Sequence, residues 1–243
     1  ALHASESKYD RDYYSSGGHN VYRSTLKEYA LINAYDYTNG KAVLGFEYKD
    51  IDGFNQYNTF PESQSGYINK AVYLSNIYDI TENTLLETNL RYDHYNKFEN
   101  RSTYKVGVKH ASVLLQGVTA SANYSTSYDA PSSYQLANQS PAVTLLSPAY
   151  TKGYDISVSY QELFSISYFN NRVEEGIDYV GVWPNAGYAN IQGTQKFSGM
   201  ELESSYALPA FNINLSANYT HLFSYEKEES TDLIRRAKDT LNA

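Results

Sequence analysis

The chain has 243 residues and a net charge of −8, and it contains no cysteine, so disulfides and thiolate metal sites are excluded. The acidic charge argues against nucleic acid as a partner, because no basic surface is present to neutralise phosphates. The apolar runs are far shorter than the roughly eighteen residues of a transmembrane helix, whereas 27 Tyr and 9 Phe favour strands and contact with lipid headgroups.

The N-terminal part of the sequence predicts the end of one strand, a loop and a hairpin. Residues 1–8 are expected to finish a strand, and the polar, Gly-containing run 9–19 is expected to be a loop. Residues 21–37 form a long extended run. The Asn39-Gly40 dipeptide that follows is a strong hairpin signal, because both central residues of a type I′ turn need a positive φ. Residues 42–49 are the returning strand.

The rest of the sequence repeats this pattern of alternating strands. In residues 118–128, Val, Ala and Tyr on one side alternate with Thr, Ser and Asn on the other. Small hydroxyl and amide groups suit a wet lumen better than a packed core. The other predicted strands are residues 68–78, 86–93, 104–109, 154–160, 164–168, 200–206 and 211–220.

The connections alternate between short and long along the chain. Short turns fall near residues 39, 82, 114, 161 and 209. Long polar loops are expected over residues 9–19, 50–66, 129–151, 172–194 and 226–232, with a shorter loop near residue 98. Short turns at one end and long loops at the other are the layout of an outer-membrane barrel. A large soluble β-sheet protein is the alternative.

These patterns predict an all-β fold, an antiparallel transmembrane β-barrel fragment of about a dozen strands, with residues 1–243 as one partial barrel domain. A tilted strand needs roughly nine to eleven residues to cross a bilayer, which residues 118–128 supply. In lipid, an open sheet would leave unpaired backbone groups along both edges. The barrel must therefore close, and we expect this chain to be a piece of a larger polypeptide.

Four stretches resemble strand signatures of the TonB-dependent outer-membrane receptors. Asp129 stands where the first of these signatures usually has a basic residue. The stretches agree with the family in order and spacing across almost the whole chain. They are residues 127–136 (SYDAPSSYQL), residues 168–179 (YFNNRVEEGIDY), Asn190-Ile191 with Gly199-Met200-Glu201-Leu202, and residues 233–238 (LIRRAK).

The resemblance implies that this chain covers the middle and late part of a 22-stranded barrel, with the plug domain absent. It implies a receptor in the outer membrane of a Gram-negative bacterium that takes up a large, scarce nutrient and is not an enzyme. Within the family, the short loops, Tyr9-Asp10 and residues 233–238 are most similar to the cobalamin receptors. Cobalamin is therefore the first choice of ligand, and a ferric siderophore or another metal chelate is the alternative.

The expected partners are the outer-membrane lipid, the receptor's own plug and, through the plug, the TonB–ExbB–ExbD complex. Two other classes stay open: a passive porin, which would lack a plug, and a soluble or surface-displayed β-sheet binding module. No catalytic motif is present in the sequence, since its five histidines are scattered and neither HExxH nor GxSxG occurs.

Candidate functional residues fall into three sets. Aromatic and amide groups at loop tips and upper lumen faces suit a large amphipathic ligand, and charged groups on strands are expected to face the lumen and the missing plug. The resemblance also implies calcium in extracellular loops as a possible cofactor, with Tyr9 and Asp10 as ligands beside Asp12. The ligand-binding candidates are Asn55, Gln56, Tyr57, Phe60, Tyr134, Gln135, Leu136, Trp183 and Asn185, and the lumen candidates are Glu87, Arg91, Asp93, Glu201, Glu203 and Arg235.

Overall fold

The computed structural model describes residues 1–15, 18–58, 62–161, 163–182, 185–227, 231–232 and 237–242. No helix among these residues is long and apolar enough to cross a membrane. The elements are β1 (Leu2–Ser15), β2 (Gly18–Tyr37), β3 (Gly40–Tyr57), β4 (Ser63–Thr81), β5 (Thr84–Tyr95), β6 (Arg101–Ala111), β7 (Val118–Asp129), α1 (Ser133–Ala137), β8 (Ala149–Tyr160), β9 (Phe164–Glu174), β10 (Ile177–Val180), β11 (Gly187–Asn190), β12 (Thr194–Leu208), η1 (Pro209–Phe211), β13 (Ile213–Lys227), β14 (Thr231–Asp232) and β15 (Asp239–Asn242).

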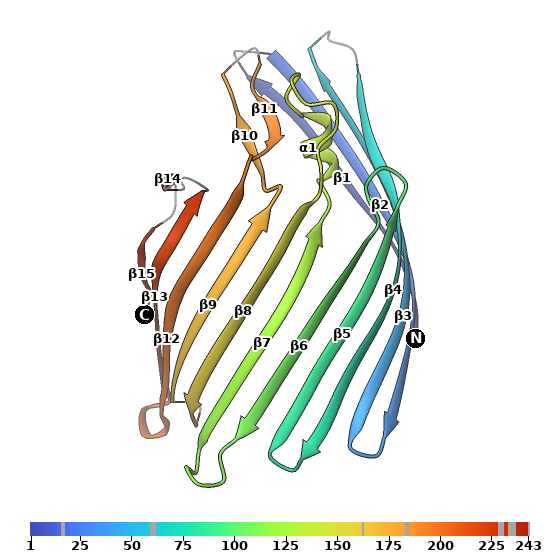
Figure 1. Cartoon of the computed structure of the whole chain (residues 1–243). Coiled ribbons are helices and arrows are strands. Elements are labelled where there is room, and N and C mark those ends of the chain that lie inside the picture. The colour runs from blue at the N-terminus through green and yellow to red at the C-terminus, as the bar shows by residue number, and fades with distance from the viewer. Residues whose placement is uncertain are drawn as a thin grey trace.

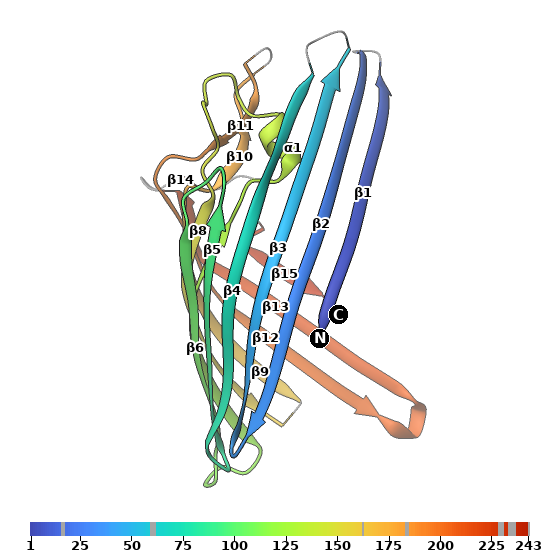
Figure 2. The ribbon, with the colours of Figure 1, turned by 90° about the vertical axis from the view of Figure 1, so that its right-hand side faces the viewer.

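The described residues form one curved antiparallel sheet of 13 strands, and the predicted all-β barrel fragment is confirmed. From β1 to β9 each strand pairs with its sequence neighbour, and β9 then pairs with β12. The hairpin β10–β11 forms a separate two-stranded sheet. Figures 1 and 2 show the large sheet as an open, tilted wall that curves around a central space.

The short turns lie together at one end of the sheet, and the longer connections lie at the other (Figure 1). The predicted asymmetry is confirmed for the long connections β7–β8 and β9–β12, but not for β1–β2, where only two residues separate the strands at the same end. The predicted hairpin turn is also present, with Asn39 at a φ of 64°, although Gly40 already belongs to β3.

Three predicted loops are wrong in extent. β1 runs on to Ser15, so residues 9–15 are strand. β3 ends only at Tyr57 and β4 begins at Ser63, so most of 50–66 is strand. Residues 172–194 contain the end of β9 and the hairpin β10–β11. Above the membrane both faces of a strand contact water, so the apolar alternation disappears although the backbone ladder continues.

The two faces of the sheet differ in chemistry, as register and exposure show. Leu44, Leu74, Leu90 and Tyr104 stand side by side on four consecutive strands. Their exposed fractions are 41%, 48%, 56% and 44%. A continuous row of exposed apolar side chains would be unfavourable in water, so this is the lipid-facing side. The polar side chains alternate with this row and occupy the concave face, which encloses the lumen.

Candidate functional site

A charged network crosses the lumen face of β3, β4 and β5. The Arg91 guanidinium donates to Asp93 Oδ2 at 2.8 Å and to Glu47 Oε2 at 2.8 Å. Asn69 Nδ2 donates to Asp93 Oδ1 at 3.0 Å. Asp93 is only 5% exposed, and its carboxylate is stabilised by these charge-assisted hydrogen bonds. These hydrogen bonds link three neighbouring strands on the lumen face of the sheet.

Other polar contacts continue along the same face of the sheet. Lys105 Nζ lies 2.8 Å from Glu87 Oε2, and Asn123 Nδ2 donates to Asp155 Oδ2 at 2.8 Å. Ser165 Oγ donates to Glu203 Oε2 at 3.2 Å. These bonds across neighbouring strands give the lumen wall a hydrogen-bonded, water-compatible surface.

The lumen candidates share one face where the structure describes them. Register places Glu87, Arg91 and Asp93 on the face of Asn123, and Glu201 and Glu203 extend it opposite Ser167 and Ser165. Whether they contact a plug stays a prediction. Arg235 lies outside the described residues.

The segment 130–148 folds from the β7–β8 end across the lumen and docks on the opposite wall. It carries α1, which lies within the curve of the sheet (Figure 2). The Ser133 hydroxyl shares hydrogen bonds with Tyr22 Oη at 2.7 Å and Ser24 Oγ at 2.9 Å. Ser65 Oγ donates to the Ser133 carbonyl at 2.7 Å. Elements more than a hundred residues apart therefore meet at one serine.

A glycine and a helix cap allow this docking. A Cβ at Gly53 would lie 2.6 Å from the Ser133 Cβ, so only glycine leaves room for the helix against β3. The helix begins with a capping box, in which Ser132 and Gln135 each accept a hydrogen bond from the other's backbone N–H. The Asn138 side chain then accepts a hydrogen bond from Asn55 Nδ2 at 3.3 Å.

Four tyrosines form a row between the docked helix and the hairpin β10–β11. The ring of Tyr134 packs edge-on against Tyr22 at 5.0 Å and contacts Tyr188 at 6.1 Å. Tyr179 packs against Tyr188 at 5.4 Å and is 58% exposed. Burial raises the pKa of the Tyr188 phenol above its ordinary value. The row offers apolar ring surface with polar ends.

Two hollows are lined in part by the two ends of the docked segment, Ala130 in one and Leu145 to Pro148 in the other. One, of about 370 Å³, is lined by residues that include Lys49, Tyr67, Asp93, Tyr95 and Tyr128.

The other hollow, of about 490 Å³, is lined by residues that include Arg101, Leu146, Tyr150 and Glu174. The guanidinium of Arg101 lies 4.2 Å from the centre of the Tyr150 ring. The aromatic and charged groups around the two hollows can contact a large ligand that has apolar and polar parts.

The ligand-binding candidates predicted from the sequence lie partly on β3 and partly in or beside the docked segment. Asn55, Gln56 and Tyr57 lie on β3 and not in a loop, and Asn55 is buried against the docked segment. Gln56 points away from Asn55 and Tyr57, because successive residues of a strand alternate.

The remaining candidates lie in or beside the docked segment. Tyr134 joins the tyrosine row, Gln135 caps the helix and Leu136 is buried. Asn185 accepts a hydrogen bond from Ser140 Oγ through its carbonyl at 3.3 Å. Phe60 and Trp183 lie outside the described residues.

The expected calcium ligands do not converge. Tyr9 faces Ser24 across β1 and β2, whereas Asp10 faces Arg23. Their side chains are therefore on opposite sides of the sheet, and Asp10 Oδ2 accepts a hydrogen bond from Arg23 Nε at 3.2 Å. Within the described ranges, no group of three His, Cys, Asp or Glu side chains could hold a metal. The two residues do not fit one site together, and calcium stays a prediction.

Sequence reasoning missed several residues that build this region. Tyr22 and Ser133 hold the docked segment, Tyr188 joins the tyrosine row, and Arg101 with Tyr150 lines a hollow. In the sequence, only the position of Tyr22 pointed to this role, because it alternates with the outward-facing residues of β2 and so belongs to the polar face. The other contacts join distant segments and leave no local pattern.

The family described as TonB dependent receptor-like, beta-barrel matches residues 3–243. Among solved structures, the copper transporter OprC is similar, with 16% identity and a TM-score of 0.69, covering 84% of this chain and 37% of OprC. The ferric enterobactin receptor PfeA has 16% identity and a TM-score of 0.70 over 94% of this chain and 42% of its own.

The alcaligin receptor FauA of Bordetella pertussis has 17% identity and a TM-score of 0.67 over 99% of this chain and 46% of its own. The chain thus spans less than half the length of these three structures. No curated protein sequence matches it. The match over residues 3–243, together with the curved antiparallel sheet, shows that the chain belongs to the β-barrel family of the TonB-dependent receptors.

Proposed function

We propose that this chain is part of the wall and the binding rim of an outer-membrane receptor for a large metal complex in a Gram-negative bacterium. The observation that carries the proposal is the docked segment 130–148, which places Tyr134 in the tyrosine row and lines part of two hollows with its two ends. A large ligand with ring surfaces and polar edges matches these groups. The lipid-facing row and the family membership support the membrane location.

A ferric siderophore is at least as well supported a ligand as cobalamin. Two similar structures are receptors named for ferric enterobactin and for alcaligin, and a third is named a copper transporter. Cobalamin is itself a large metal complex and remains the alternative within the family. A passive porin is less well supported, because the family match is to receptors.

Uptake would be driven from the inner membrane by the TonB–ExbB–ExbD complex through a plug inside the barrel. The polar lumen face supports this part of the proposal, because Glu87, Arg91 and Glu203 keep charge directed at the enclosed space. A hydrated interface of this kind would bind a plug through water-mediated contacts that can break when the plug moves.

The test uses the complete receptor that contains this barrel. Tyr179→Ala removes the exposed end of the tyrosine row, and we expect about fivefold weaker binding, since an aromatic contact contributes roughly 1 kcal/mol beyond area burial. The measurement is quenching of intrinsic fluorescence by ferric enterobactin, ferric alcaligin and cyanocobalamin in parallel. Tyr160→Ala, on a residue 46% exposed at the opposite end of the wall, is the matched control.

The proposal predicts saturable binding of one of the three complexes and a selective loss in Tyr179→Ala. Binding of cyanocobalamin alone would select the cobalamin alternative. Binding of none, or equal affinity in the Tyr179→Ala and Tyr160→Ala variants and the unmodified receptor, would reject the proposed rim.

A further inference from the structure

The docked segment and the hairpin β10–β11 form one body at the end of the barrel that carries the long connections (Figure 1). The Ser140 N–H donates to the Tyr188 carbonyl at 2.8 Å, and the Tyr188 N–H donates to the Asn138 carbonyl at 2.9 Å. The Asn190 side chain accepts from the Ser147 N–H and donates to the Ser147 carbonyl, both at 2.8 Å. We call the docked segment together with β10 and β11 the mouth flap.

The chain connections of the mouth flap all lie on one side of the barrel wall. The docked segment leaves β7 and returns to β8, and the hairpin leaves β9 and returns to β12. These four strands are neighbours in the sheet. The hairpin departs at Glu175 and rejoins the wall after Gly193, where φ is 56° and 82°. Residues at the ends of elements absorb the backbone rotation of a hinge, so the hinge of the flap runs along β7–β12.

The opposite side of the flap is held by side chains of the wall. Among the described residues, every hydrogen bond from the flap to β2, β3 or β4 uses the side chain of Tyr22, Ser24, Asn55 or Ser65. No described strand of the flap pairs with these three strands. The contact can therefore open without breaking a backbone ladder, which would have to separate along its whole length.

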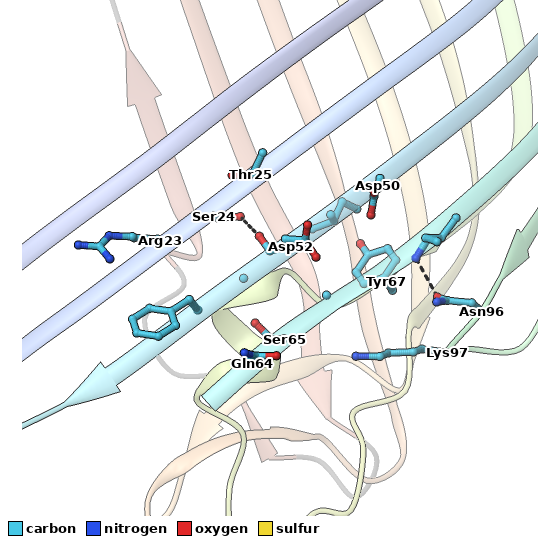
Figure 3. Close-up of a pocket in the computed structure, with 15 residues that line it drawn as sticks. Arg23, Ser24, Thr25, Asp50, Asp52, Gln64, Ser65, Tyr67, Asn96 and Lys97 are labelled. Carbon is cyan, nitrogen blue, oxygen red and sulfur yellow. Dashed lines mark hydrogen bonds between the residues drawn. The ribbon is translucent and has the colours of Figure 1, made fainter. Parts of the chain in front are cut away.

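Three of these side chains converge on Ser133 of the flap, and Figure 3 shows two of them, Ser24 and Ser65. Ser24 Oγ donates to the Asp52 carbonyl at 3.0 Å, because a carbonyl can only accept. The Ser133 hydroxyl must then donate to Ser24 and accept from Tyr22. One hydroxyl of the flap thus completes a chain of three hydrogen bonds across the wall. We call Ser133 with Tyr22, Ser24 and Ser65 the serine latch.

A buried atom beside the serine latch lacks a partner. Asn55 is 7% exposed and donates through Nδ2 to Asn138, but its Oδ1 has no hydrogen-bond partner. A buried acceptor without a partner costs free energy, and water removes that cost when the site opens. This oxygen therefore favours the open flap and offsets part of the stabilisation by the latch.

The closed flap covers a hollow that reaches the lumen. The hollow of about 370 Å³ is lined by Ala130 at the base of the flap and by Arg91 and Asp93 of the charged network on the lumen face. We propose that the mouth flap is a gate, which is hinged along β7–β12, is held shut by the serine latch and moves as one body to admit the nutrient. The cargo of this gate rests on the proposed function, whereas its motion rests on the hinge and the latch.

The first test locks the serine latch in the complete receptor, on a background without other cysteines. The Oγ atoms of Ser24 and Ser133 lie 2.9 Å apart, so the pair Ser24→Cys and Ser133→Cys is placed to form a disulfide. Ser121→Cys with Ser157→Cys is the matched control, because these hydroxyls lie 2.7 Å apart within the wall, on β7 and β8. Cells that express each receptor are assayed for binding and uptake of radiolabelled ferric enterobactin, ferric alcaligin and cyanocobalamin.

We expect the oxidised Ser24–Ser133 cysteine pair to leave binding unchanged and to lower uptake at least tenfold, and a reductant should restore uptake. The oxidised control pair should leave both unchanged. Uptake by the locked receptor at the rate of the control would overturn the gate. Loss of binding together with uptake would show that the latch shapes the binding rim, which also contradicts the proposal.

The second test needs no nutrient, so it decides on the gate even if none of the three complexes binds and the proposed function fails. Nitroxide labels on Thr144→Cys in the flap and Lys70→Cys on β4, two exposed positions, report the distance across the latch by double electron–electron resonance. Ser133→Ala removes the latch hydroxyl, and we expect a second, longer distance to appear.

Ser121→Ala removes a hydroxyl of the same kind within the wall and should keep the distance of the unmodified receptor. The same distance in Ser133→Ala as in Ser121→Ala would overturn the gate. A heat-modifiability gel establishes that the barrels of all variants are folded.

Discussion

Arg91 shows how a single-layered sheet, which has no hydrophobic core packed on its lumen face, stabilises charged side chains there. Its guanidinium is 31% exposed and donates to both Glu47 and Asp93, while Asp93 receives a further bond from Asn69. A buried carboxylate is stable only while these donors remain, because desolvation penalises an unpaired charge. The residue thus couples three neighbouring strands through electrostatics.

We expect Arg91→Met in the complete receptor to lower the free energy of unfolding by about 2 kcal/mol, between the values for exposed and buried ion pairs. The methionine keeps the apolar stem but removes the cation of Asp93, while Glu47 keeps only the longer contact with Lys49 Nζ at 3.7 Å. Guanidinium chloride titration, followed by tryptophan fluorescence, measures the change as a lower midpoint.

Lys8→Met is the control for this variant, because the Lys8–Glu6 pair is largely exposed at 72% and 46%. Its midpoint should be indistinguishable from that of the unmodified receptor. A midpoint for Arg91→Met that equals the control would show that the network contributes nothing to stability.

At the scale of elements, the docked segment depends on space as much as on hydrogen bonds. Ser133 reaches Tyr22, Ser24 and Ser65 only because Gly53 presents no side chain. The helix has five residues, too short to be stable alone. Its position is therefore set by the wall on which it docks.

Gly53→Val should release α1 from the wall, because the added Cβ would meet the Ser133 Cβ and Ser65 Oγ. We expect limited proteolysis of folded receptor to cut within residues 130–148 at least tenfold faster. Gly107→Val is the matched control, since its Cβ would meet mainly the movable Asn123 side chain. Unchanged cleavage in Gly53→Val would mean that the docking does not require the glycine.

The sequence predicts the membrane part of this fold better than the rest, for a physical reason. Between lipid and lumen, a strand must alternate, so residues 118–128 and the short turns could be recognised. Outside the membrane that constraint ends, and β1 and β3 continue through residues predicted as loops.

The candidate site was only partly predictable from the sequence. Tyr134 packs in the tyrosine row of the docked segment, and its contact with a ligand stays a prediction. Its partners Tyr22 and Tyr188 come from distant elements, and no local pattern encodes such contacts. The charged residues Glu87, Arg91 and Asp93 lie on one face, because strand parity alone decides it, and their contact with a plug stays a prediction.

At the scale of the molecule, the sheet has an apolar outer face, and its described edge strands have backbone N–H and C=O groups that pair with no neighbouring strand. Among the described strands, β1 pairs only with β2 along its 14 residues. Unpaired edges recruit other strands, and the exposed row with Leu44, Leu74 and Leu90 recruits lipid or other apolar surface.

Residues 1–243 expressed alone without detergent should therefore aggregate. We expect more than nine-tenths of the protein in the pellet after ultracentrifugation, and far less in detergent micelles. The complete receptor purified in the same detergent is the control. A folded, soluble monomer without detergent would contradict the assignment of the apolar face to lipid.

The pairing order also implies a sequence of events in time. Strands β1 to β9 each pair with the next strand along the chain, so hairpins can form locally and join quickly. Tyr22 and Ser133 are 111 residues apart, and their bond requires both walls to exist first. During assembly the lumen therefore stays open until β2, β3 and β4 have paired and the chain has passed β7, and the docking of α1 follows these steps.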